Sequence, residues 1–209
     1  MTTRNPSPID TLVISLDNAL RTVIGKPIVT ERSNPAKDLP EHEMSEQEQL
    51  HTARLMRINH TGEVCAQALY QGQAVTARLP DVRESMERAA MEENDHLDWC
   101  EKRLQELDNR KSLLNPLWYT GSFMIGAAAG IAGDKWSLGF VAETEKQVTS
   151  HLENHLSRLP SQDEKSRAIL EQMKEDEMQH ATTALEAGGA ELPSPIKAAM
   201  KLTSKAMTK

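Results

Sequence analysis

The chain has 209 residues, and its 31 acidic and 24 basic residues give a net charge of −7. The length suits one domain with a full hydrophobic core, and the negative charge excludes the basic surface on which nucleic-acid binding depends. Apolar residues are 38% of the total and form no long hydrophobic span, so we expect no transmembrane helix; without a charged leader before an apolar run, we expect no signal peptide.

The first predicted element is an amphipathic helix over residues 9–24, where apolar residues recur at helical spacing. Residues 25–47 contain Pro27, Pro35 and Pro40 among polar residues, a composition typical of a connector. We therefore divide the chain into residues 1–44, an N-terminal helix and connector, and residues 45–209, the main domain.

A long helix is predicted from Ser45 to Leu79, because Arg78-Leu79-Pro80 follows a continuous helical pattern. Its inward stripe, with alternate spacings of four and three residues, contains four consecutive polar side chains. Buried polar groups without partners are costly, so this stripe predicts a polar site and not a packing surface. The stripe consists of Met56, His60, Glu63, Gln67, Tyr70, Ala74 and Ala77.

The second long helix is predicted over residues 81–109. Glu93 lies on its otherwise apolar stripe, His96 lies at the border of the stripe, and Glu92 lies to one side. Residues three apart share a helix face, so Glu93-Asn94-Asp95-His96 directs a carboxylate and an imidazole the same way.

A third long helix follows Asp134 and ends at Arg158-Leu159-Pro160. Its inward stripe contains Glu145, whereas Glu143 falls well off this face. The periodicity therefore selects Glu145 as the acid that this helix contributes to an interior site.

The fourth long helix, over residues 161–187, carries a second Glu-x-x-His, in which Glu177 and His180 interrupt an apolar row. The tripeptide Arg-Leu-Pro precedes both motif-bearing helices, which indicates an internal repeat of two helical hairpins. We also predict that each begins with a capping box, formed by Asp81-x-x-Glu84 and Ser161-x-x-Glu164.

These elements predict an all-α fold, a ferritin-like four-helix bundle built from two repeated hairpins. In such bundles two Glu-x-x-His motifs and one Glu from each of the other two helices hold a pair of iron or manganese ions. Counted from the hairpin turns, the acids lie at similar depths. The predicted ligands are Glu63, Glu93, His96, Glu145, Glu177 and His180.

Between the hairpins, residues 113–133 combine Trp118 and Tyr119 with a segment rich in Gly and Ala. This segment suits a membrane interface, or a crossover helix whose small residues allow close packing. The C-terminal helix carries Ile196, Met200 and Met207 beside Lys197, Lys201, Lys205 and Lys209. It suits either a basic amphipathic contact with a membrane or a solvated tail.

The residues around the proposed ligands form six motifs: Leu55–Glu63, Tyr70–Gln73, Glu92–Leu97, Met124–Gly133, Glu145 with His151 six residues on, and Asp176–His180. With these spacings, residues 50–190 closely resemble the demethoxyubiquinone hydroxylases of ubiquinone biosynthesis. The stretch before about residue 45 resembles only the longer bacterial members. Where the family often has a second acid after the third-helix Glu, this chain has Lys146.

The resemblance implies a di-iron monooxygenase that uses O₂ to add the last ring hydroxyl to a polyprenylated methoxy-benzoquinol. It implies two iron ions per chain, held by the six predicted ligands with Glu93 and Glu177 as bridges. The electron donor is left open between NADH and the quinol itself. His60, Tyr70 and His151 are candidates for orienting ligands or relaying protons, and the alternative for each is a structural role.

We expect the protein to bind the polyprenyl benzoquinol and the cytoplasmic face of the bacterial cell membrane as a peripheral protein, not to bind nucleic acid, and to form a homo-oligomer or join a biosynthetic complex. The substrate ring is expected to enter from the membrane side between the third long helix and the Gly-rich segment, and a bulky Gly126→Leu change is expected to impair turnover while sparing the iron. Two alternatives remain: a ferritin-like iron-storage or peroxide-scavenging protein, and a non-enzymatic lipid carrier at the membrane surface.

Overall fold

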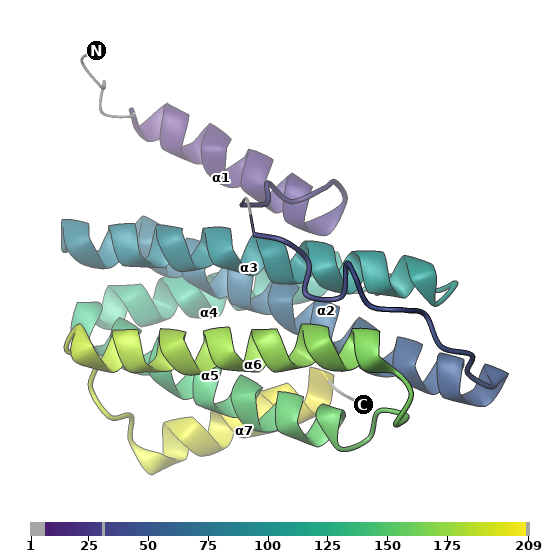
Figure 1. The fold of residues 1–209 in the computed structure, drawn as a ribbon. Helices are drawn as coiled ribbons and strands as arrows, with labels where there is room; N and C mark the ends of the chain where they lie inside the picture. The colour runs from purple at the N-terminus through teal and green to yellow at the C-terminus, as the bar shows by residue number, and fades with distance from the viewer. Residues whose placement is uncertain (1–6, 31, 208–209) are drawn as a thin grey trace.

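The computed structural model describes residues 7–30 and 32–207, so Lys209 of the predicted basic helix lies outside the described residues, as does the side chain of Met207. Seven α-helices and no strands make up the described part of the chain, as the all-α prediction requires (Figure 1). The helices are α1 Pro8–Val23, α2 Glu46–Thr76, α3 Pro80–Glu106, α4 Asn115–Ala132, α5 Asp134–Leu156, α6 Glu164–Glu186 and α7 Ser194–Met207.

The helices α2, α3, α5 and α6 form the predicted four-helix bundle, with one hairpin from α2 and α3 and the other from α5 and α6 (Figure 1). Three clusters of buried apolar side chains fill the bundle, and the largest includes Leu55, Trp99, Leu152 and Met173 from the four helices. The polar part of the α2 stripe lies inside this packed interior, where Glu63 and Gln67 are both buried.

The two predicted capping boxes are wrong, although the repeated turns are present. Pro80 is the first residue of α3, and the amides of Arg78 and Leu79 donate to the Asp134 carboxylate at the beginning of α5. At α6 the cap is Asp163, which accepts from the Ser166 amide. Neither Asp81 nor Ser161 is the N-cap residue: Leu79 takes that position at α3 without a side-chain hydrogen bond, and Asp163 takes it at α6. The path of each loop, and not the local spacing, decides which residue is placed at the cap.

The Gly-rich segment forms the crossover helix α4, which packs along α2. A side chain at Gly72 would collide with the backbone of α4, and one at Gly126 would collide with the backbone of α2 at Leu69. The close-packing interpretation of the small residues is therefore confirmed. Gly126 itself is buried against α2, so a leucine there would collide with the backbone at Leu69. The expected entrance between the third long helix and the Gly-rich segment stays a prediction. Gly133, with φ of 117°, alone separates α4 from α5.

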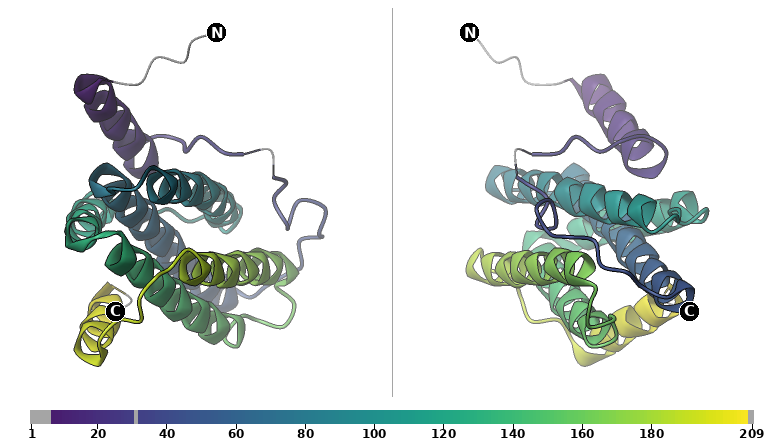
Figure 2. Two further views of the ribbon diagram at one scale, coloured as in Figure 1. Left: turned by 90° about the vertical axis from the view of Figure 1, so that its left-hand side faces the viewer. Right: turned by 45° about the vertical axis from the view of Figure 1, so that its right-hand side comes forward.

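The connector between α1 and α2 runs across α3 and α6 on the outside of the bundle (Figure 2). The backbone amide of Thr30 donates to Asp95 Oδ1 at 2.7 Å, and the Arg32 guanidinium donates to Asp176 Oδ2 at 2.6 Å. Farther along, Glu41 accepts from the buried guanidinium of Arg103 on α3. The predicted division at residue 45 stays a prediction, but the connector is attached to two helices of the bundle.

The terminal helices leave apolar side chains exposed. On α1, Ala19 and Val23 pack against the bundle and Thr22 is buried, whereas Val13, Leu16 and Leu20 are exposed. In the left view of Figure 2, α1, α4 and α7 lie along one side of the bundle and the connector along the other. Within the described residues, none of the helices combines the length and hydrophobicity needed to cross a lipid bilayer.

Candidate metal centre

Four buried side chains from three helices converge in the middle of the bundle. Glu63 comes from α2, Glu93 and His96 come from α3, and Glu177 comes from α6. One oxygen or nitrogen atom of each lies within 4.8 Å of the others. Carboxylate oxygens and imidazole nitrogens are suitable ligands for iron. These four residues therefore form a candidate metal site, and they lie at a common depth in the bundle, as counting from the hairpin turns predicted.

The imidazole of His96 faces all three carboxylates of this group. Its Nδ1 atom lies 3.3 Å from Glu63 Oε2, 3.2 Å from Glu93 Oε2 and 3.2 Å from Glu177 Oε1. Because one ring nitrogen is directed at three acidic side chains from α2, α3 and α6, the carboxylates point at a common space and not at solvent.

The second imidazole faces the other oxygens of two of these carboxylates. His180 Nδ1 lies 3.1 Å from Glu177 Oε2 and 3.4 Å from Glu93 Oε1. Glu93 and Glu177 thus each present one oxygen to each histidine. If a pair of ions were bound beside the two histidines, these two carboxylates would reach both, and they are the residues for which the resemblance implied a bridging role.

The third-helix acid also lies inside. Glu145 is buried, and its Oε1 accepts a hydrogen bond of 2.6 Å from the Tyr70 hydroxyl on α2. Glu143 instead lies 3.6 Å from Lys197 Nζ of α7. The stripe argument thus placed the two acids correctly. Tyr70 also meets the His180 ring edge-on, with centroids 6.3 Å apart, so it contacts two of the predicted ligands.

Burial and mutual repulsion perturb the acids of this centre. Burial raises the pKa of Glu63 well above its ordinary value, and the charges of Glu93 and Glu177 raise it further. Burial likewise raises the pKa of Glu145, again helped by Glu177 and Glu93. Although burial opposes it, hydrogen bonds to Asp176 and Glu177 raise the pKa of His96. A positive charge among these acids, on an imidazole or a bound cation, relieves their mutual repulsion.

The donor set fits two divalent cations. Four carboxylates carry enough negative charge to balance two such ions, and two imidazoles complete a ligand set of the ferritin-like kind. In addition, Glu145 Oε2 is buried without a hydrogen-bond partner among the residues that the structure describes. An unpaired buried carboxylate oxygen costs free energy, and binding a cation would remove that cost.

Two carboxylates that sequence reasoning did not select hold the outer nitrogens of the histidines. Asp176 of α6 lies 2.9 Å from His96 Nε2 on α3, and Glu92 of α3 lies 2.6 Å from His180 Nε2 on α6. Each acid directly precedes the Glu of its own motif and contacts the histidine of the other. A repeated acid before Glu-x-x-His was the available signal. Such outer partners fix the tautomer and orientation of ligand histidines.

The connector adds a further contact on the His96 side only. Arg32, which donates to Asp176, also places its guanidinium 5.2 Å from the centre of the Trp99 ring. Trp99 in turn lies 5.4 Å from the His96 ring, centroid to centroid. Arg32 therefore reaches the surroundings of His96 through both a carboxylate and an aromatic ring.

The structure places the other two candidate histidines differently. His60 is buried toward α4, where its Nδ1 lies 3.5 Å from Asn115 Nδ2, and burial lowers its pKa to about 3. His151 lies on α5 beside the cavity described next, and its ring is 3.9 Å from that of His155. His60 thus has surroundings typical of a structural residue, while His151 faces a space that a ligand can occupy.

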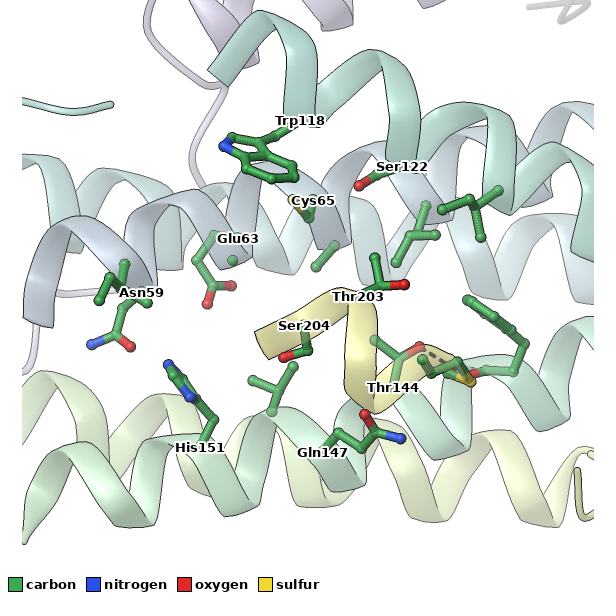
Figure 3. A pocket seen from close by; sticks show the side chains of 18 of the residues that line it. Asn59, Glu63, Cys65, Trp118, Ser122, Thr144, Gln147, His151, Thr203 and Ser204 are labelled. Carbon is green, nitrogen blue, oxygen red and sulfur yellow. Dashed lines mark hydrogen bonds between the residues drawn. The ribbon is translucent and has the colours of Figure 1, made fainter. Parts of the chain in front are cut away.

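A cavity of about 360 Å³ lies between α2, α4, α5 and α7 and reaches Glu63 (Figure 3). This volume is within the range of about 300–1,000 Å³ typical of small-molecule sites. Its walls are mainly apolar and include Trp118, Phe140 and Val148. Ile196 and Met200 of α7 also line it, so the apolar face of the C-terminal helix covers the cavity.

Comparison with known proteins agrees with this geometry. The sequence pattern of the ubiquinone biosynthesis protein COQ7 family matches residues 50–209, which include the whole candidate metal centre. The chain belongs to this family. The COQ7 family match begins after the connector, yet curated relatives also cover the N-terminal region.

Three of these relatives carry the name 3-demethoxyubiquinol 3-hydroxylase. The protein of Nitrosococcus oceani is 62% identical over 206 residues, covering 99% of this chain and 96% of the relative. That of Nitrosomonas europaea is 60% identical over 201 residues, 96% of each chain. That of Acinetobacter baumannii is 58% identical over 206 residues, 99% of this chain and 97% of the relative. Membership of the COQ7 family and near full-length identity show a hydroxylase of ubiquinone biosynthesis.

Proposed function

We propose that this hydroxylase uses a two-iron centre to insert oxygen into the ring of a polyprenylated methoxy-benzoquinol. The observation that carries the proposal is the position of Glu93 and Glu177, each with one oxygen toward His96 and the other toward His180. The ligand set is completed by Glu63 and Glu145. Two ferrous ions bound there would supply electrons for the activation of O₂.

The reaction adds one oxygen atom of O₂ to a ring C–H bond, while the other oxygen leaves as water with two electrons and two protons from a donor. We propose NADH or the quinol itself as that donor. Tyr70 can hold a proton at its hydroxyl against Glu145. His151 can exchange one at Nε2, which is buried at the cavity. The apolar cavity walls exclude water from the reacting ring.

The substrate tail accounts for the apolar side chains on one side of the molecule. Leu16 and Leu20 of α1 and Leu117 and Met124 of α4 are exposed, and α1, α4 and α7 share one side in Figure 2. We propose that this side rests on the cytoplasmic face of the cell membrane, so that the ring enters the cavity while the tail stays in lipid. The same apolar surface suits a second copy of the chain or another enzyme of the biosynthesis.

The iron-storage and peroxide-scavenging alternative shares the proposed ligands but gives no role to the cavity that reaches Glu63. The lipid-carrier alternative gives no role to the converging carboxylates. A reduced, iron-loaded sample given a short-tailed demethoxyubiquinol separates them. We expect hydroxylated product in step with O₂ consumption and two iron ions per chain. Consumption of O₂ without ring hydroxylation would favour peroxide scavenging, and failure to bind iron would favour the carrier.

A further inference from the structure

Two buried polar atoms without partners lie at one end of the apolar cavity. Asn59 is 3% exposed, and both its Nδ2 atom and the Nε2 atom of His151 lack a hydrogen-bond partner among the described residues. Both side chains line the cavity, and Figure 3 shows them with Glu63 around the same end of it. A buried polar atom without a partner costs free energy, so a group that pairs with it gains affinity.

The Asn59 carboxamide is held in place by a residue outside the cavity lining. Its Oδ1 lies 2.8 Å from His155 Nδ1 on α5. A carbonyl oxygen can only accept, so His155 Nδ1 carries the proton in this pair. His155 is buried, and burial lowers its pKa to about 3, which keeps the ring neutral. With Oδ1 engaged by His155, the two N–H donors of Asn59 Nδ2 remain for a ligand.

The position of Asn59 on α2 relative to Glu63 matters for the substrate. It precedes Glu63 by four residues, which is about one helical turn or 6 Å along the axis. A benzoquinone spans a similar length from one ring oxygen to the other. A ring oxygen bound at Asn59 would therefore leave the opposite part of the ring near Glu63, the one residue of the four-membered metal site that lines the cavity.

We propose that the Asn59 carboxamide, positioned by His155, is the donor that binds an oxygen substituent of the benzoquinol ring and so decides which ring carbon faces the metal centre. The proposal rests on the hydroxylase function and adds the residue that orients its substrate. The remaining cavity wall near Trp118 takes the apolar part of the molecule.

The test uses the oxidised, short-tailed demethoxyubiquinone as the probe, because quinone oxygens accept hydrogen bonds and cannot donate them. Its binding to the iron-loaded protein is followed by quenching of Trp118 fluorescence, with Trp118→Phe as the blank. Asn59→Asp keeps the size of the side chain and the acceptor for His155 but replaces the Nδ2 donor by an acceptor. We expect affinity to fall about 10-fold, the equivalent of ~1.4 kcal/mol for one lost hydrogen bond.

Thr203→Val is the matched control, because it removes a hydroxyl from the same cavity and should leave the affinity unchanged. The positioning role of His155 is tested by two variants. His155→Leu should weaken quinone binding, and His155→Gln should restore it by donating to Asn59 Oδ1; a purely structural histidine would show no such rescue.

Iron content and helical circular dichroism should match the wild type in each variant. If Asn59→Asp does not fold, the comparison of His155→Leu with His155→Gln tests the subsite by itself. Wild-type affinity in Asn59→Asp, or equal affinity of the two His155 variants, would overturn the subsite while leaving the hydroxylase intact. A wild-type protein that neither binds the quinone nor hydroxylates the quinol would instead overturn the function.

Discussion

The two Glu-x-x-His copies have the same local geometry but different surroundings. In each, the Glu lies three residues before its His, and an acid from the other copy holds the outer nitrogen. The His96 side chain is fully buried, and its partner Asp176 is also bound by Gln172 and Arg32. The His180 side chain is 9% exposed, and its partner Glu92 is 36% exposed. The repeat thus provides two similar Glu–His pairs, and from the connector contacts we expect the His96 pair to be held more rigidly.

The largest effect should come from removing a carboxylate that both halves share. Glu177→Ala should lower iron affinity by more than about 100-fold, beyond the range usual for outer partners, because Glu177 faces both histidines. Metal analysis of the purified protein measures this. Glu143→Ala is the control, since it removes an acid of the same helix as Glu145 that lies off the inward stripe and contacts Gln147 and Lys197. Iron loss from Glu143→Ala as large as that from Glu177→Ala would contradict this assignment.

The two outer carboxylates should differ when each is neutralised. Asp176→Asn should weaken iron binding by about 10–100-fold, as expected for an outer partner of a buried ligand. Glu92→Gln should have a smaller effect, since water can replace the lost oxygen at this more exposed position. Competition with a ferrous chelator gives both affinities. Equal losses would show that the connector side is no more rigid than the other.

The pKa of His60 contrasts with that of His96 in the metal centre, which is raised. Burial lowers the pKa of His60 to about 3 from 6.5. Because the folded pKa is the lower one, this group's contribution to stability is complete above pH 6.5 and is lost as pH falls toward 3. Between pH 6.5 and pH 5 the loss should be about 2 kcal/mol in the free energy of unfolding.

Urea unfolding of wild type and His60→Gln across this pH range tests the contrast. The variant should lose less stability than the wild type as the pH falls. Parallel curves for the two proteins would mean that His60 gains its proton as easily in the folded state as in the unfolded state.

The smallest effect should come from the connector itself. Arg32→Gln removes the guanidinium from both Asp176 and Trp99, and iron affinity should fall about 3-fold, near 0.6 kcal/mol for a partly exposed ion pair. In combination with Asp176→Asn it should add little, because we expect the ion pair with Asp176 to carry most of the effect and the Trp99 contact little. Arg21→Gln, which affects only an exposed pair with Asp17 within α1, is the control. If the losses of iron affinity in the two single variants add in the double variant, Arg32 acts through a contact other than Asp176.

The sequence by itself was enough to predict the bundle and the inward acids. Helical periodicity is local, so the choice of Glu145 over Glu143 needed only the spacing within one helix. The same holds for the two Glu-x-x-His pairs, whereas the close-packing role of the small residues of α4 was decided by the contact of α4 with α2. Residues 45–79 and 81–109 were assigned to helices that differ from α2 and α3 by only a few residues at their ends.

Only the tertiary structure decided which side chains from different elements meet. Asp176 lies 80 residues from His96 and 144 from Arg32, and their contact depends on the rotation of α3 against α6 and on the path of the connector. The same is true of α7, whose apolar face covers the cavity. The pairing of Asn59 with His155 also joins separate helices. Such contacts depend on the relative placement of whole helices, which burial of the shared core determines and local spacing does not.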